Sequence, residues 1–496
     1  MPKYFMGIDI GGTMTKTAIF DTKGAEIAVA AENTPVITTR ENYQERDMLL
    51  LWDAVKRTIK AALTKSGIHS RDIAGIGCTG HGKGLYLWGK DGRPAYNAIA
   101  STDHRAADIV KQWDENGISE KAKKITLQNV IDCQPAALLA WMKETHPEVL
   151  QNTQWIFEAK DYIRFMLTGE AYAEVTDYSG TSLMNLHTQS FDKELMKLFG
   201  IGVLYDCLPL LKYSYEHCGC ITEEVANQTG LYAGIPVCGG MFDIDACAIA
   251  MDVSTPEKLC VITGTWSINE YISEAPIDPA GTTQNSLFCI PGFYLIEESS
   301  PTSAGNLEWV IEMFLTAERA EAESKGLPIY QYIDEAVIST SPHDSGLIFF
   351  PFLYGSNANY TSSAFFGLNS SHTKAHILRA VFEGVVFSHM THIEKLLELR
   401  ENPSAIRIAG GAVNSSVWTQ MFADVIGLPV EVVGVKELGA MGAAMAAAIS
   451  AGEYRDYRYA AGTMGGYVKT IFPHDELNQI YSGKYMKYKN MLEVLR

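Results

Sequence analysis

The pattern of apolar and polar positions near the N-terminus predicts two strands joined by a tight turn. Apolar residues dominate YFMGIDI, Gly11 and Gly12 interrupt them, and a second run follows in MTKTAIFD. Short apolar runs separated by glycine are typical of paired strands. Residues 258–271, KLCVITGTWSINEY, repeat the order strand, Gly-Thr turn, hydroxyl and strand about halfway along the chain. One such hairpin in each half predicts two related domains.

Elsewhere amphipathic helices alternate with short buried strands, which is typical of an α/β protein. Strands are predicted over residues 73–78 and 406–409, and a Gly/Ser/Asn-rich loop over 354–363. Turn-rich residues 252–256 predict a boundary between a domain at 1–253 and a second at 254–496. Helices are predicted over residues 47–66, 106–116, 136–145, 160–167, 246–251, 305–314, 373–400 and 418–426.

Length and charge restrict the class of protein. The 496 residues exceed what one hydrophobic core usually organises, which also favours two domains. The net charge of -18 argues against nucleic acid or an anionic membrane as partner, because like charges repel. No long apolar run predicts a membrane span, and a strand begins too early for a signal peptide. We therefore expect a cytoplasmic protein with a small-molecule substrate.

The nine cysteines are scattered, and several lie in apolar runs, which is typical of reduced core residues. Only Cys218 and Cys220 are closely spaced, with His217 beside them. Because no second Cys or His pair follows at ligand spacing, a structural zinc site is disfavoured.

The first hairpin has the composition of a phosphate-binding turn. Gly11 and Gly12 permit positive φ and close approach of an oxyanion, and Thr13, Thr15 and Lys16 can donate to phosphate together with the turn amides. The sequence is neither a Walker loop nor a dinucleotide loop.

Asp9 leaves the first strand beside this turn. Its carboxylate is placed to hold a hydrated Mg²⁺ ion against phosphates. The alternative is an ordinary β-hairpin with a Gly-Gly turn and solvated threonines, since such turns are common.

Asp243 follows a short predicted strand and the pair Gly239-Gly240, and it precedes a helical run. If ATP lies across the two hairpins, this carboxylate can accept the proton of an attacking hydroxyl. The alternative is a helix cap, which aspartate provides well. Beside two phosphate hairpins we favour the base. Asp245, two residues later, is the nearest competing carboxylate.

Two further glycine-rich segments allow two interpretations each. Gly410 and Gly411 follow a predicted strand and precede Asn414. Such small residues let the flat base of a nucleotide lie on the backbone. The alternative is that the glycines only form a tight turn between a strand and a helix. The segment 439–444, GAMGAA, either contributes to a site or is a small-residue helix face that packs closely on a sheet.

The order of these motifs resembles the FGGY family of carbohydrate kinases over nearly the whole chain. The resemblance implies two ribonuclease-H-like domains of the actin-like ATPase type, with ATP and sugar in the cleft between them. It implies ATP and Mg²⁺ as cofactors, with Mg²⁺ held by Asp9 through water, and Asp243 as general base. The residues that it assigns to the nucleotide are Gly11, Gly12, Thr13, Thr15, Lys16, Gly264, Thr265, Gly305, Gly410, Gly411 and Asn414.

Substrate choice in this family comes from the first domain. Where this chain has Gly82-Lys83, glycerol kinases have Arg-Glu and xylulokinases have Met-His, so neither identity carries over. The combination of segments 45–48 (ERDM), 82–84 (GKG), 101–105 (STDHR) and 240–243 (GMFD) is most similar to bacterial L-xylulose kinases, which phosphorylate the terminal hydroxyl of a ketopentose. His81 departs from the expected glutamine, so xylulose, ribulose, erythritol and gluconate stay open as substrates.

The residues expected to bind the sugar are Arg46, Asp47, His81, Lys83, Asp103 and Asp243. Lysines in loops are usually solvated, but Lys83 stands between two glycines and can reach either a ketose hydroxyl or the carboxylate of a sugar acid. Asp103 can accept from sugar hydroxyls, while the role of Arg105 beside it is left open.

A different class of function is also possible, because ATP-driven clamps that have no sugar substrate share the actin-like fold. The candidate base and the polar loops on the first domain favour an enzyme. Dimers are common among relatives, so a homodimer is a further expectation.

Overall fold

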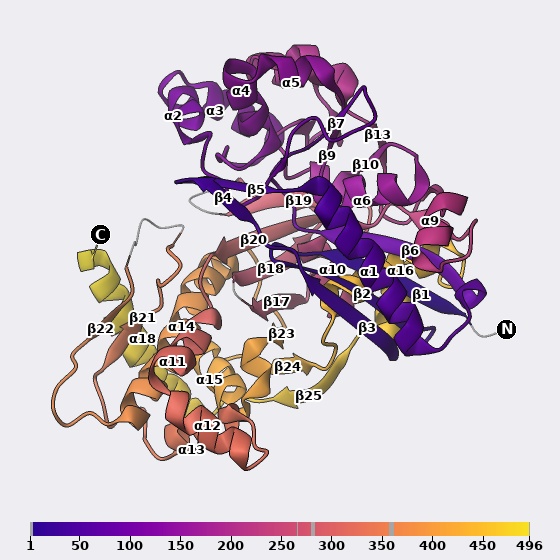
Figure 1. Cartoon of the computed structure of the whole chain (residues 1–496). Coiled ribbons are helices and arrows are strands. Elements are labelled where there is room, and N and C mark those ends of the chain that lie inside the picture. The colour runs from indigo at the N-terminus through magenta and orange to yellow at the C-terminus, as the bar shows by residue number, and fades with distance from the viewer. Residues whose placement is uncertain (1–2, 265, 279–282, 357–361, 496) are drawn as a thin grey trace.

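The computed structural model describes residues 3–264, 266–278, 283–356 and 362–495. Two seven-stranded sheets dominate these residues, and Figure 1 shows each sheet within its own body, flanked by helices. The first sheet contains β1 (Tyr4–Ile10), β2 (Met14–Asp21), β3 (Glu26–Asn33), β6 (Ile73–Gly80), β14 (His217–Cys220), β15 (Pro236–Cys238) and β16 (Met241–Phe242). The second contains β17 (Lys258–Thr263), β18 (Ser267–Ser273), β19 (Gln284–Leu287), β20 (Tyr294–Ser300), β23 (Ala405–Gly410), β24 (Val430–Val433) and β25 (Tyr467–Ile471).

The two sheets share one strand order. In the first, β3, β2 and β1 are antiparallel neighbours, β6 and β15 continue in parallel, and β14 is antiparallel. In the second, β20, β18 and β17 are antiparallel, β23 and β24 continue in parallel, and β25 is antiparallel. The prediction of two related α/β domains with the ribonuclease-H-like arrangement is therefore confirmed.

The longer helices agree with the predicted ones, because their apolar spacing matches the buried face of each helix. The helix α10 begins three positions before the predicted start at Ala246. The α-helices are α1 (Met48–Ser66), α2 (Ala107–Glu115), α3 (Ile118–Thr126), α4 (Pro135–Thr145), α5 (Pro147–Asn152), α6 (Ala159–Thr168), α7 (Val175–Tyr178), α8 (Lys193–Leu198), α9 (Glu223–Thr229), α10 (Asp243–Ala250), α11 (Gly305–Phe314), α12 (Thr316–Ser324), α13 (Ile329–Ile338), α14 (Lys374–Glu398), α15 (Ser416–Ile426), α16 (Leu438–Ser450), α17 (Tyr457–Met464) and α18 (Asp475–Leu495).

Smaller sheets form around the two large ones. The predicted loop at 354–363 falls between β21 (Ile348–Phe350) and β22 (Ala364–Phe366), and residues 357–361 are outside the described residues. The smaller sheets are formed by β4 (Ile37–Arg40), β5 (Tyr43–Arg46) and β8 (Ala98–Ile99), by β7 (Tyr86–Gly89) and β9 (Thr153–Phe157), by β10 (Tyr172–Glu174) and β13 (Leu210–Lys212), by β11 (Met184–Asn185) and β12 (Ser190–Phe191), and by β21 (Ile348–Phe350) and β22 (Ala364–Phe366).

The helices α10 and α16 lie between the two large sheets and share one hydrophobic core with both of them. Contact is close because the facing residues are small: a Cβ atom added to Gly7 of β1 would lie 1.8 Å from the Ala440 oxygen, and one added to Gly442 would lie 2.3 Å from the Ala246 oxygen. The small-residue segment 439–444 is therefore a tightly packed helix face.

The packing of α16 affects the domain division. This helix belongs to the second half of the sequence but packs on β1 and β6 of the first sheet. The first sheet uses strands up to Phe242 and the second begins at Lys258. The boundary at 253 and 254 falls between the sheets, and it stays a prediction as a division into independent folding units.

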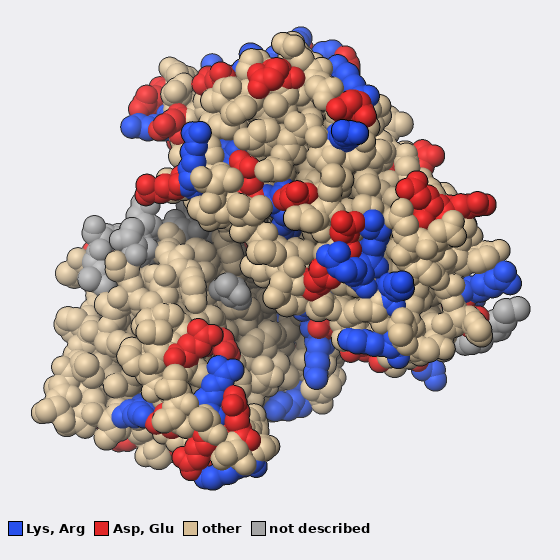
Figure 2. All heavy atoms as spheres, in the orientation of Figure 1, with Lys and Arg blue, Asp and Glu red and all other residues tan. Residues whose placement is uncertain are grey.

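The surface carries charges of both signs, and the described cysteines form no disulfide. Figure 2 shows positive and negative side chains interspersed on one face, which is hollowed between the two domains. None of the described helices is long and apolar enough to cross a membrane. All nine cysteines are free thiols, and most of them are buried.

Candidate active site

The first hairpin forms as predicted, but its turn differs in detail. Neither Gly11 nor Gly12 has a positive φ, so that part of the prediction was wrong. A Cβ atom added to Gly12 would meet no heavy atom within 4 Å, which leaves space for a ligand beside the turn. Thr13 is exposed, whereas Thr15 is fully buried and its hydroxyl donates to the Asp9 carbonyl oxygen at 3.2 Å.

Asp9 faces the N-terminal end of α16. A Cβ atom added to Gly439, the second residue of that helix, would lie 2.6 Å from Asp9 Oδ2. Burial raises the pKa of Asp9 to about 6; the Lys16 ammonium opposes this rise and Glu437 adds to it. Lys16 Nζ itself lies 2.8 Å from Glu437 Oε2. The side chains of both domains therefore set the charge on Asp9.

Asp243 is the first residue of α10, directly after the short strand β16, whose residues pair with Thr79 and Gly80 of β6. Its side chain is partly exposed and interacts with the Ile244 backbone N–H. The N-cap position of α10, which the alternative interpretation gave to Asp243, is occupied by Phe242. Burial, with Asp9, Asp177 and Glu297 nearby, raises the pKa of Asp243 well above the ordinary value. A carboxylate with a raised pKa is suited to accept a proton.

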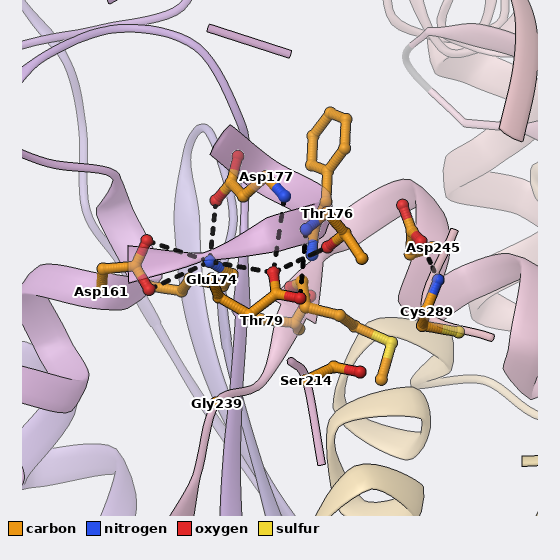
Figure 3. Close-up of polar contacts among 12 residues, drawn as sticks. Thr79, Asp161, Glu174, Thr176, Asp177, Ser214, Gly239, Asp245 and Cys289 are labelled. Carbon is orange, nitrogen blue, oxygen red and sulfur yellow. Dashed lines mark hydrogen bonds and ion pairs between the residues drawn. The ribbon is translucent and has the colours of Figure 1, made fainter. Parts of the chain in front are cut away.

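Asp245 lies in a different environment. It is fully buried, and its Oδ1 accepts a hydrogen bond from the Cys289 backbone N–H of the second domain at 2.8 Å (Figure 3). Burial, together with Glu174 and Glu270, raises the pKa of Asp245 well above the ordinary value. Two residues along a helix turn a side chain by about 200°, which separates the two carboxylates.

The predicted nucleotide glycines of the second domain lie together. Gly410 ends β23 opposite Thr263, the residue before Gly264, and a Cβ atom added to Gly410 would lie 2.5 Å from the Thr263 oxygen. Gly410 has φ of 97°, a conformation that favours glycine. A Cβ atom added to Gly411 would lie 3.0 Å from Ala304 Cβ, next to Gly305 at the start of α11. Three glycine-containing turns therefore lie together at the C-terminal ends of β17 and β23.

Of the other two predicted nucleotide residues of this domain, the structure describes Asn414 but not Thr265. Asn414 is exposed and ends the short 3₁₀ helix Gly411–Asn414. Thr265 lies outside the described residues.

A buried histidine of α14 connects two of these turns. His389 Nε2 lies 2.7 Å from Ser303 Oγ, close to Gly305, and its Nδ1 lies 3.0 Å from Ser267 Oγ, close to Gly264. Burial lowers the pKa of His389 to about 3, and His392 adds to this effect, so the ring is neutral. It therefore links the two segments through hydrogen bonds without adding charge.

Two of the predicted sugar residues contact the protein backbone. Arg46 is buried and donates to the carbonyl oxygens of Gly11, at 3.3 Å, and of Gly12. It thereby connects the predicted sugar segment to the phosphate hairpin. Asp47 caps α1, accepting from the backbone N–H groups of Leu49 and Leu50.

Asp103 has no exposed surface, and both of its oxygens are engaged within the protein. The Gln44 backbone N–H donates to Oδ2 at 2.6 Å, and Arg105 Nε donates to Oδ1 at 2.9 Å. Arg105 also pairs with Glu45 at 3.0 Å. This environment favours a structural role for the Asp103–Arg105 pair.

The segment around Lys83 is unusual. Lys83 has φ of 65°, which costs energy for a side-chain-bearing residue and is typical of functional sites. Burial opposes its charge, but Glu297, Asp243 and Asp177 nearby raise the pKa of Lys83. His81 Nε2 lies 3.0 Å from the Tyr86 hydroxyl, and burial together with Arg46 lowers the pKa of His81 to about 3. The cationic group near Asp243 is therefore Lys83 rather than His81.

Three charged residues of the site were missed by the sequence interpretation: Asp177 and Glu297 near Asp243, and Glu437 near Asp9. Glu437 had a recognisable signal, because an acidic residue directly before a helix is a common capping pattern. Asp177 and Glu297 had none, since Asp177 approaches Asp243 only through the fold of the first domain and Glu297 only through the packing of the two domains.

The residues fit a nucleotide and a magnesium ion. Open space at Gly12, the glycine turns around Gly264 and the first amides of α11 are features that accommodate phosphates. Mg²⁺ is usually held by one or two carboxylates with phosphate oxygens and water. The described residues contain no cluster of three or more His, Cys, Asp or Glu side chains that would hold a metal alone. Asp9, partly exposed at the hairpin, fits the usual arrangement.

Comparisons with known proteins agree with this geometry. The L-xylulose/3-keto-L-gulonate kinase of Escherichia coli (strain K12) is 37% identical over 100% of this chain and 98% of that protein. The probable L-xylulose kinase of Haemophilus influenzae is also 37% identical, over 99% of both chains. A crystal structure of ligand-bound xylulose kinase from Lactobacillus acidophilus has a TM-score of 0.89 at 24% identity, covering 99% of this chain and 98% of that chain, which shows the same fold.

Models of two successive domains match the two halves of the sequence. The N-terminal domain of the FGGY family of carbohydrate kinases matches residues 4–250, and the C-terminal domain matches residues 259–451. With full-length relatives that are kinases of this type, the protein belongs to the FGGY family of carbohydrate kinases and uses ATP as phosphate donor.

Proposed function

We propose that this kinase phosphorylates the terminal hydroxyl of L-xylulose or of a related keto sugar acid, with Asp243 as general base. The observation that carries the proposal is the environment of Asp243, a partly exposed carboxylate with a raised pKa at the start of α10, between the two domains. The full-length similarity to L-xylulose/3-keto-L-gulonate kinase supports the choice of substrate.

In the proposed reaction, Asp243 orients the sugar hydroxyl and accepts its proton while the hydroxyl oxygen bonds to the γ-phosphorus of ATP. The bond between that phosphorus and the bridging oxygen breaks, and ADP leaves. The amides beside Gly12 and the glycine turns at Gly264 and Gly305 hold the phosphates in position. A magnesium ion, held through water by Asp9, would neutralise the charge that develops on the phosphates. Lys16, released from Glu437, is placed to donate to the same phosphates.

The sugar side of the site is proposed at the loop that contains His81 and Lys83. Lys83 is near Asp243, so a substrate that reaches the base also reaches this ammonium. A sugar acid would pair its carboxylate with Lys83, whereas a neutral ketose would offer only hydroxyls. Arg46 and Asp103 are proposed to shape this region, since their polar atoms bond to the protein.

The proposal is tested by measuring ATP consumption with and without sugars. The panel contains L-xylulose, 3-keto-L-gulonate, D-xylulose, L-ribulose, gluconate and erythritol. We expect ADP formation to require a sugar and to be fastest with one of the first two. Hydrolysis of ATP at the same rate without any sugar would favour an ATP-driven clamp. Fastest turnover with one of the last four sugars would refute the proposed substrate but not the assignment as a sugar kinase.

A further inference from the structure

The four residues before Asp243 are held by hydrogen bonds from four directions. Arg164 Nη1 donates to the Gly239 oxygen at 2.5 Å, and the Gly240 N–H donates to the Ser214 oxygen at 2.9 Å. The Thr79 hydroxyl donates to the Met241 oxygen at 2.9 Å. The Phe242 N–H donates to the Thr176 hydroxyl oxygen at 2.9 Å. The backbone on which Asp243 is mounted is therefore anchored at every residue from Gly239 to Phe242.

At Gly240 the backbone lies very close to strand β6 of the first sheet. It has φ of 74°, and a Cβ atom there would lie 1.9 Å from the Cys78 oxygen. A backbone this tightly placed leaves Asp243 little freedom to move along the direction of β16.

One of these anchors connects to a buried cluster of charges. The Lys160 ammonium lies 3.0 Å from Asp161 Oδ2, 3.2 Å from Asp177 Oδ2 and 3.5 Å from Glu174 Oε2, and all four side chains are fully or almost fully buried. Figure 3 shows the carboxylates of Asp161, Glu174 and Asp177 around one position, joined to it by dashed lines. Such a network is costly unless its members are paired, and when they are paired it has few alternative arrangements.

The Thr176 hydroxyl joins the charge cluster to the backbone. It donates to Glu174 Oε2 at 2.7 Å, which leaves its oxygen to accept from the Phe242 N–H. The Thr176 backbone N–H also donates to Glu174 Oε1 at 3.1 Å. The direction of the hydroxyl proton is therefore defined, and the chain of contacts runs from Lys160 through Glu174 and Thr176 to Phe242.

We propose that Thr176 is a positioning residue for catalysis, because its hydroxyl transfers the fixed geometry of the Lys160 cluster to the backbone that carries Asp243. This inference rests on the proposed role of Asp243 as general base. Thr176 has no exposed surface, so we expect it to contact neither the sugar nor the nucleotide. Its loss should therefore lower kcat and leave the KM values for ATP and sugar nearly unchanged.

The test compares Thr176→Val with Thr176→Ser. Valine has a similar shape but neither donates to Glu174 nor accepts from the Phe242 N–H, which is then buried and unpaired. Because small displacements of a reacting group cost up to about 10²-fold in rate, we expect kcat to fall about 10- to 100-fold. KM values should stay within about threefold. Serine keeps the hydroxyl and should restore most of the rate.

Thr229→Val is the matched control. Thr229 is equally buried in the first domain, but its hydroxyl donates to Val225 of its own helix α9. Its kcat should stay near that of the wild type. A Thr176→Val enzyme with wild-type kcat, or a Thr176→Ser enzyme as slow as the valine variant, would overturn the inference. If Thr176→Val does not fold, Thr79→Val removes another anchor of the same backbone and is judged by the same criteria.

A double variant separates this inference from the proposed function. If Thr176 acts through Asp243, then Thr176→Val should slow an Asp243→Asn enzyme by less than about threefold, because the two changes affect one step. Equal losses in both backgrounds would overturn the positioning role alone. An Asp243→Asn enzyme that keeps its rate would overturn the base and this inference together.

Discussion

The Lys16 ammonium of the first hairpin lies 2.8 Å from the Glu437 carboxylate, 421 positions later in the chain. Glu437 directly precedes α16, so this ion pair joins the proposed phosphate turn of one domain to a helix from the other half of the sequence. The same Glu437 adds to the rise in the pKa of Asp9 that burial causes. The proposed magnesium residue is therefore sensitive to how the two domains meet.

Asp243→Ala should abolish most of the sugar phosphorylation while the protein stays folded. Loss of a general base costs about 10²- to 10⁴-fold in rate, whereas a helix cap costs roughly 1 kcal/mol in stability. Turnover on L-xylulose and the melting temperature separate the two. Asp245→Asn is the control, since an amide oxygen can still accept from Cys289, and it should stay active. If Asp245 proves essential and Asp243 dispensable, the base is two residues from its proposed position.

The pH dependence of kcat/KM should reflect the environment of Asp243. The base must be ionised, and burial together with Asp9, Asp177 and Glu297 raises its pKa. Activity should therefore fall with decreasing pH at a midpoint well above about 4, the usual pKa of aspartate. The profile is measured at saturating Mg²⁺ and ATP with the sugar concentration varied, in wild type and Asp245→Asn. A midpoint near 4 in the wild type would contradict the buried environment.

Asp9→Asn should reduce Mg²⁺-dependent turnover far more than sugar binding, because it removes the carboxylate proposed to hold the ion's water shell. Turnover is measured across Mg²⁺ concentrations, and sugar binding by calorimetry. Near-wild-type turnover at saturating Mg²⁺ would remove Asp9 from the mechanism. Parallel loss of turnover and sugar binding would indicate a folding role.

The Asp9→Asn variant should also be more stable than the wild type at neutral pH. Folding raises the pKa of Asp9 from 3.8 to about 6, so the folded state disfavours the ionised form. The cost of that charge is fully present above about pH 6 and is absent below about pH 4, where both states hold the proton. The gain in melting temperature should therefore shrink as pH falls from 7.5 to 4. A gain that does not change with pH would contradict this assignment.

Lys83→Met should distinguish a sugar acid from a neutral ketose. If Lys83 pairs with a substrate carboxylate, kcat/KM for 3-keto-L-gulonate should fall roughly 10- to 100-fold, the usual range for a charged hydrogen bond, and the loss for L-xylulose should be smaller. Lys90→Met is the control, because the Lys90 side chain is exposed and its ammonium donates to the Gln151 oxygen. Equal losses on both substrates would assign Lys83 to a shared hydroxyl or to Asp243.

His389→Ala should weaken the nucleotide side of the site. It removes the hydrogen bonds that connect Ser267 and Ser303, which flank the turns at Gly264 and Gly305. We expect KM for ATP to rise about 10-fold, consistent with the loss of one or two hydrogen bonds, while KM for the sugar changes little. An equal rise in both KM values would indicate a general loss of packing in the second domain.

Local sequence determined the elements and much of the site. The apolar spacing of residues 47–66 and 373–400 is a helical period that the core then buries, so both helices form close to their predicted bounds. The Gly-Gly and Gly-Thr segments each separate two antiparallel strands, β1 from β2 and β17 from β18, as their sequences predicted. Residues of these kinds could be found because their roles depend on neighbours along the chain.

Tertiary structure alone decided which distant groups the candidate site residues meet. Lys16 meets Glu437, Lys83 comes near Glu297, and the Phe242 N–H meets Thr176, all between residues far apart in sequence. It also decided that Asp103 is enclosed by Gln44 and Arg105 rather than open to solvent. Pattern and composition report burial along one element, but pKa values and hydrogen-bond partners depend on which elements pack together, and here that depends on α10 and α16 lying between the two sheets.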